Sequence, residues 1–239
     1  MILTNHRIVS KWKTILVFIG TLILGYLLFI IPDLFFGISK INGGKIGVNL
    51  FFIALFQFVS ILGLLYLSLK LLKKSWKDIG LEFIHLRKDM GLGLLFGVLW
   101  TILQFVLIIP GTGGINRPDI KGMLELFDGS VSGTLSFIAL GVIGGGITEE
   151  LFNRGFFINV LKEVFEKPKV GLWVSSVLSI LIFSLGHMPV TALDWMDILI
   201  PTVGYTFLFI YTKRLTASMV AHGFYNMAAI LMVYWMYYH

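Results

Sequence analysis

The run ILVFIGTLILGYLLFII, residues Ile15–Ile31, contains seventeen residues and no charged side chain. A helix rises about 1.5 Å per residue, so a run of this length approaches the roughly 30 Å hydrocarbon core of a bilayer. A basic stretch precedes the run, as in a secretory signal peptide, but the run contains no convincing small-residue cleavage site. We therefore interpret Ile15–Ile31 as the centre of a first membrane span.

The composition of the whole chain agrees with this interpretation. Hydrophobic residues make up 57% of the 239 positions, charged residues make up 13%, and the mean hydropathy is +0.89. Because soluble domains carry about 25% charged residues, this composition indicates a polytopic membrane protein. The chain has no cysteine, which excludes disulfides, thiolate metal sites and a cysteine nucleophile.

Apolar runs of suitable length predict an all-α, polytopic membrane helical bundle. We expect seven transmembrane helices, with eight as the alternative. The expected spans are 14–36, 47–69, 90–110, 131–160, 170–187, 195–212 and 215–236. Residues 73–88 alternate cations with apolar side chains, which predicts a segment at the membrane interface. No separate soluble domain or tandem repeat is visible, so we expect residues 1–239 to form a single integral membrane domain.

The basic residues predict the orientation of the bundle. If the N-terminus is cytoplasmic, 14 of the 19 lysines and arginines fall in cytoplasmic segments, 4 fall in outer segments, and Arg154 lies within a span. The outer four are Lys40, Lys45, Arg117 and Lys121, and the inner set begins with Arg7, Lys11 and Lys13. The positive-inside rule therefore predicts a cytoplasmic N-terminus. Topology and anionic lipid also account for the net charge of +6. We therefore expect the lipid bilayer as a partner and no nucleic acid.

Three clusters of polar residues interrupt the predicted spans. Ionisable groups inside membrane helices cost at least a few kcal/mol each, so they usually mark a function. The clusters are Glu149-Glu150-Leu-Phe-Asn-Arg154, Phe183-Ser-Leu-Gly-His187 and His222-Gly-Phe-Tyr-Asn226. Antiparallel helices joined by the basic turn near Lys167 would carry Glu149 and His187 to similar depths, about 24–30 Å along the helix axis.

The first cluster places two carboxylates in different surroundings. In an α-helix Glu150 and Arg154 share a face, at the i,i+4 spacing of an ion pair, whereas Glu149 points about 100° away and has no local cation. This arrangement separates the roles of two carboxylates. A buried pair that only fixes helix packing explains Glu150 and Arg154 equally well, but it does not explain Glu149. The glycines at 144–146 allow another backbone or a substrate to approach closely.

A carboxylate, two histidines and an amide are suited to activating water. A glutamate can take a proton from water while histidine and asparagine stabilise the oxyanion that forms at a peptide carbonyl. His187 lies one turn after Phe183, and His222 one turn before Asn226. The set Glu149, His187 and His222 could instead hold a catalytic zinc ion. The sequence has no HExxH motif, so spacing gives the zinc alternative no support.

Taken together and in this order, the three motifs resemble those of the CPBP family, which includes the CAAX proteases and bacteriocin-processing enzymes and is also called the Abi family. The resemblance covers residues 131–230, the expected protease core; residues 1–130 resemble the family only in being hydrophobic helices. It implies an intramembrane endopeptidase. In it Glu149 is the general base, His187 helps to position the water, and His222 and Asn226 form the oxyanion hole. Glu150 completes the candidate catalytic set, and Arg154 and Phe183 support it. We favour a mechanism without a metal cofactor.

The leading hypothesis is therefore a peptidase of the bacterial plasma membrane that acts on a hydrophobic or membrane-associated peptide or protein. A non-catalytic immunity or sensor-modulating protein is the alternative from another class, and the intact motifs count against it. A proton-coupled transporter would use the same buried charges, but no inverted repeat is evident.

Overall fold

The structure, a computed structural model, describes residues 9–238. Arg7, counted above among the cytoplasmic cations, lies outside the described residues. Seven helices are long and apolar enough to cross a membrane, which confirms the predicted all-α bundle and its seven spans. The spans are Lys11–Ser39, Asn49–Leu71, Leu86–Gly111, Val131–Val164, Pro168–Gly186, Ala192–Thr212 and Thr216–Tyr238. The protein is thus an integral membrane protein.

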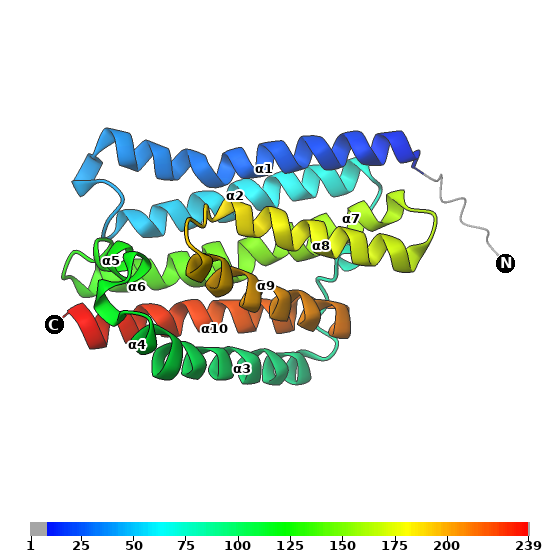
Figure 1. The fold of residues 1–239 in the computed structure, drawn as a ribbon. Coiled ribbons are helices and arrows are strands. Elements are labelled where there is room, and N and C mark those ends of the chain that lie inside the picture. The colour runs from blue at the N-terminus through cyan, green and yellow to red at the C-terminus, as the bar shows by residue number, and fades with distance from the viewer. Residues whose placement is uncertain (1–8, 239) are drawn as a thin grey trace.

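The first two spans are the helices α1 (Lys11–Ser39) and α2 (Asn49–Leu71), and the third begins with α3 (Leu86–Ile102). The last three are α8 (Pro168–Gly186), α9 (Ala192–Thr212) and α10 (Thr216–Val233). Successive spans run in opposite directions, so α1 begins at one end of the bundle and α10 finishes at the other (Figure 1). The short helices α4 (Ile109–Gly111) and α5 (Pro118–Leu124) lie at the end where α10 finishes (Figure 1).

Segments between these helices form short turns. Residues 73–88, predicted to lie at the interface, contain the short 3₁₀ helix η2 (Trp76–Ile79). Gly80 follows it with a φ of 87°, a conformation that glycine adopts without strain. Its carbonyl accepts a hydrogen bond from the Leu215 N–H, 2.9 Å away, at the turn between α9 and α10. At the same turn Arg214 makes two hydrogen bonds of 2.6 and 2.9 Å to Asp89 at the start of α3.

The fourth span differs from the expected regular α-helix. It starts as α6 (Val131–Ala139), continues as the π-helices η5 (Leu140–Glu149) and η6 (Leu151–Ile158), and ends with α7 (Asn159–Leu161) and η7 (Lys162–Val164). In a π-helix each N–H reaches the carbonyl five residues back, which widens the turn. The Thr148 hydroxyl follows the same spacing and donates to the Ile143 carbonyl at 2.6 Å. The assumption of 100° per residue is therefore wrong for this span.

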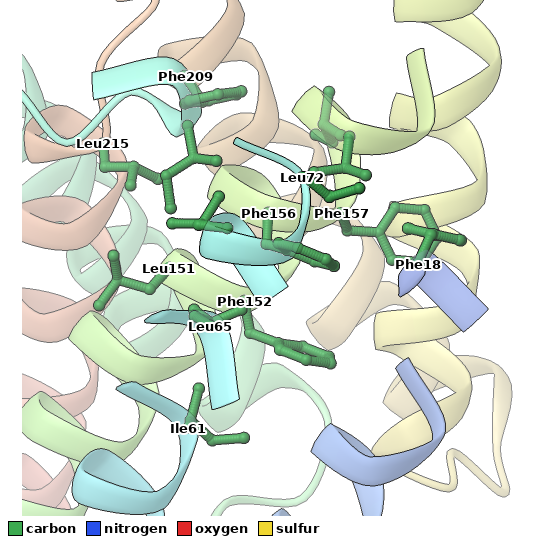
Figure 2. Packing of buried hydrophobic residues seen from close by; sticks show 14 residues of the cluster. Phe18, Ile61, Leu65, Leu72, Leu151, Phe152, Phe156, Phe157, Phe209 and Leu215 are labelled. Atoms are coloured by element: carbon green, nitrogen blue, oxygen red, sulfur yellow. The ribbon is translucent and has the colours of Figure 1, made fainter. Parts of the chain in front are cut away.

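The π-helix η6 runs through the middle of the bundle, and every residue from Leu151 to Ile158 is buried. Its phenylalanines pack against α1 and α2; the rings of Phe18 and Phe157, for example, meet edge to face at 4.9 Å. Figure 2 shows this cluster, in which side chains of η6 lie among those of Ile61, Leu65 and Leu72. By contrast, most large apolar side chains of α1 are exposed, as suits a surface that faces lipid. The residues from Leu151 to Ile158 are thus held in a closely packed, largely apolar interior.

Candidate active site

Two glycines bring the fourth span into contact with α10. A methyl group on Gly146 would lie 2.5 Å from the Cα of Gly223, a distance that real Cβ atoms essentially never show. Only residues without side chains let two helices approach so closely. Gly146 precedes Glu150 by four residues, and Gly223 directly follows His222. This crossing therefore explains why Glu150 and His222 meet.

Glu150 lies between a histidine and an arginine. Its Oε1 is 2.9 Å from His222 Nδ1 and 3.0 Å from Arg154 Nη1, and the side chains of Glu150 and Arg154 are completely buried. The guanidinium of Arg154 keeps its charge and therefore favours the ionised form of Glu150. An ionised carboxylate only accepts hydrogen bonds, so His222 donates from Nδ1. Its other ring nitrogen, Nε2, faces Glu149, with 3.9 Å to Oε2. The predicted pair of Glu150 and Arg154 is present, and His222 connects it to Glu149.

Glu149 is the more accessible of the two glutamates, with 25% of its side chain exposed. It lines a cavity of about 450 Å³ between α1, α2, the fourth span and α8. His187 and Phe183 line the same cavity, on the wall formed by the end of α8. The structure thus places Glu149 and His187 on one cavity, as the depth argument predicted.

His187 makes a hydrogen bond through one of its two ring nitrogens. Its Nδ1 lies 2.9 Å from the carbonyl oxygen of Phe183. A carbonyl only accepts, so Nδ1 carries the proton, and in the neutral ring Nε2 is left as an acceptor. The rings of Phe183 and His187 also lie 4.5 Å apart. The Phe183-xxx-His187 motif therefore sets both the tautomer and the position of this exposed imidazole.

A second, smaller cavity of about 160 Å³ lies on the other side of Phe183 and His187. His222 and Asn226 of α10 line it. Asn226 donates one amide N–H to the Gly141 carbonyl at 2.9 Å, which leaves its second N–H for another acceptor. A methyl group on Gly145 would lie 2.5 Å from Asn226 Nδ2, so glycine at this position makes room for the amide.

A metal centre is not assembled from these side chains. Among residues 9–238, no group of three histidine, aspartate or glutamate side chains has an arrangement that could hold a metal ion. The zinc set considered above, Glu149, His187 and His222, therefore does not fit a zinc ion in this geometry.

The structure also adds polar residues that the motifs do not include. Asp197 of α9 lines the small cavity and forms an ion pair with Arg117. Its Oδ1 accepts a hydrogen bond of 2.8 Å from Gln104. Burial lowers the pKa of Arg117, but its hydrogen bonds to Asp119 and Asp197 outweigh that effect and raise it. Arg117 was expected only as a cation of an outer segment; its side chain is 3% exposed. An aspartate within a predicted span was the signal that could have revealed this cluster.

Tyr26 of α1 is another such residue. Its hydroxyl donates to Asn153 Oδ1 at 3.4 Å, and both side chains line the large cavity with Glu149. Phe29 and Ile30 extend the same wall along α1. The first span, which carries none of the motifs, therefore forms one side of the candidate site.

Comparison with known proteins agrees with the motifs. Residues 131–228 match the family model of Rce1-like type II CAAX prenyl endopeptidases. No curated protein and no solved structure matches the chain. The matched segment contains all three motifs and the crossing of the fourth span with α10, and with the seven spans it indicates a protease of the membrane. The segment from residue 131 to residue 228 is therefore similar to the Rce1-like domain of the CAAX proteases, the family that the three motifs predicted.

Proposed function

We propose that the protein is an intramembrane endopeptidase that hydrolyses a peptide bond in a hydrophobic or membrane-associated peptide, using water activated by Glu149 and His187. One observation carries the proposal. Glu149, His222, Glu150 and Arg154 form a continuous chain of contacts, from 3.9 Å down to 2.9 Å, that ends at a cavity also lined by His187. A scaffold protein has no need of such a chain in an apolar interior, where each charge is costly.

In the proposed reaction Glu149 takes a proton from a water molecule in the large cavity, and His187 Nε2 accepts a hydrogen bond from the same water. The water oxygen attacks the carbonyl carbon of the substrate and forms a tetrahedral intermediate. The proton then passes from Glu149 to the substrate nitrogen, the C–N bond breaks, and a new carboxyl group and a new amine leave. Every atom of the added water is thereby accounted for.

His222 and Asn226 are suited to stabilising the oxyanion of that intermediate. When protonated, His222 donates from Nε2, while its Nδ1 stays bound to Glu150. Asn226 has an amide N–H that Gly141 does not use. Donors held in place before the reaction stabilise a developing charge most strongly in a water-poor site. Glu150 and Arg154 are proposed to fix His222, and Phe183 to fix His187.

The walls of the large cavity suggest the kind of substrate. Aromatic and aliphatic side chains of α1 form most of one side, and an ion pair between Asp33 and Lys45 lies on the same cavity. Its volume of about 450 Å³ lies within the range of binding pockets for small ligands. We propose that it holds apolar residues beside the scissile bond. A bacterial plasma membrane, with the N-terminus in the cytoplasm, is the proposed location.

The test uses the full-length protein in proteoliposomes and quenched fluorescent peptides with apolar residues around the scissile bond. Each peptide is offered with and without a farnesyl group on a cysteine near its C-terminus. We expect Glu149→Gln and His187→Ala each to abolish cleavage at normal membrane insertion, and the double variant to be no worse, because the two residues act as a unit.

Glu163→Gln is the matched control, since Glu163 belongs to the same span. It pairs with Lys74 at 2.5 Å with 45% of its side chain exposed, so it contributes little. More than a few per cent of activity in Glu149→Gln would contradict the proposed role of Glu149. Preference for farnesylated over plain peptides would define the substrate class.

A further inference from the structure

Tyr205 of α9 lies against the face of the His222 ring. The two ring centroids are 4.7 Å apart, and the planes differ by 15°, which makes this a stacked pair. Tyr205 is 2% exposed and lines the small cavity beside His222 and Asn226. It belongs to none of the three motifs. We infer that Tyr205 is a positioning residue for His222, an inference that rests on the proposed function.

The His222 ring is held from three directions. Glu150 binds its Nδ1 at 2.9 Å, Tyr205 stacks on its face, and the Phe183 ring lies 6.2 Å away at 81°, edge to face. A hydrogen bond at Nδ1 still lets the ring rotate about that bond, which would swing Nε2 away from Glu149. The flat contact with Tyr205 prevents this rotation. The position of Nε2 therefore depends on Tyr205 as well as on Glu150.

The ring of Tyr205 also suits a protonated histidine. The face of an aromatic ring carries negative charge density, which attracts cations, and the attraction grows when water is excluded. The guanidinium of Arg154 lies 5.9 Å from the Tyr205 ring centre and 4.4 Å from that of Phe183. Tyr205 and Phe183 thus provide aromatic faces to the cations on both sides of Glu150.

The hydroxyl group of Tyr205 has no part in this inference. Its oxygen is buried and has no hydrogen-bond partner among the described residues. A role of the ring predicts that phenylalanine can replace tyrosine. A role of the hydroxyl group in donating to the substrate predicts that it cannot.

The experiment compares Tyr205→Phe with Tyr205→Leu in the full-length protein. We expect Tyr205→Phe to keep kcat within about twofold. Tyr205→Leu should lose about 10- to 30-fold in kcat at nearly unchanged KM, the effect of losing a desolvated contact between a cation and an aromatic ring. Phe209→Leu is the matched control. It lies one turn later on α9 and is 3% exposed, but it packs in the core beside Leu215, away from His222.

A second measurement does not depend on activity. In the NMR spectrum of the protein labelled at histidine, the ring protons of His222 should carry a ring-current shift from Tyr205. This shift should persist in Tyr205→Phe and in Phe209→Leu, and should disappear in Tyr205→Leu.

Three outcomes would overturn the inference: equal losses in Tyr205→Phe and Tyr205→Leu, full activity in Tyr205→Leu, or an equal loss in Phe209→Leu. If the wild-type protein cleaves none of the peptides, the proposed function fails, while the NMR arm still tests the placement of His222.

Discussion

Removing the negative charge of Glu150 should destabilise the protein far more than removing an exposed one. In Glu150→Gln, Arg154 stays completely buried and loses the carboxylate that now lies 3.0 Å from its Nη1. None of the three nitrogens of Arg154 makes a hydrogen bond of good geometry among the described residues, so only the aromatic faces of Phe183 and Tyr205 would remain beside its charge. Leaving one partner of a buried ion pair costs about 3–5 kcal/mol. Glu163→Gln, in the exposed pair with Lys74, should cost about 0–1 kcal/mol.

The assay is reversible unfolding in mixed micelles with a rising fraction of denaturing detergent, followed by tryptophan fluorescence. Arg154→Met should be destabilised to a similar degree, because it leaves the Glu150 carboxylate buried without the guanidinium that neutralises it. The double variant Glu150→Gln/Arg154→Met removes both charges, so we expect it to be more stable than the sum of the two single losses predicts. If Glu150→Gln unfolds at the wild-type detergent fraction, or if the losses simply add, the pair does not determine stability and this reasoning is wrong.

Two further predictions concern the chemistry. Asn226→Ala should lower kcat by about 10²–10³-fold at nearly unchanged KM, the usual cost of losing one oxyanion donor. Asn226→Asp should be at least as poor, because a carboxylate repels the oxyanion. Wild-type turnover in Asn226→Asp would show that Asn226 is only a packing residue. We also expect cleavage to continue after exhaustive chelation, because the histidine, aspartate and glutamate side chains of residues 9–238 form no group of three that could hold a metal ion. Loss of activity with chelator and its return with added zinc would instead assign these residues as ligands.

The fold could be predicted from sequence because a bilayer imposes a simple rule. Each span needs about 20 apolar residues with their backbone groups paired within the helix. The expected ranges agree with the observed ones to within a few residues at each end; the first span, for example, extends from Lys11 to Ser39 instead of 14–36. The ends differ because polar residues such as Lys11 can belong to a helix that extends into the interface. The π-helical segments were missed, both in the fourth span and in the shorter segments η3 (Leu103–Ile108) and η8 (Tyr234–Tyr238) of the third and seventh spans. Apolar periodicity does not distinguish a π-helix from an α-helix.

The candidate residues were predicted from two signals, charge within the spans and the three motifs, and the motifs alone singled out Phe183 and Asn226. Glu149, Glu150, Arg154, His187 and His222 stand out because ionisable groups are rare in spans. Tyr205 does not stand out, because one tyrosine among many aromatic residues in membrane helices carries no signal of its own; its importance comes from packing against a helix that follows it in the chain. The burial of Arg117 was missed for a related reason, since counting cations by segment does not reveal which of them are buried.

Under the proposed function, the reacting groups and the residues that select the substrate come from different parts of the chain. Glu149, His187, His222 and Asn226 all come from the segment that matches the family, whereas Tyr26, Phe29 and Ile30 of α1 form the opposite wall of the large cavity. We therefore expect a substitution on that wall to change which side chains fit beside the scissile bond while the proposed reacting groups stay in place. The match begins at residue 131, whereas the cavity extends to α1. Under the proposed function, the first span therefore belongs to the same functional unit as residues 131–228. A truncated chain that begins at residue 131 would therefore lack a wall of its own site.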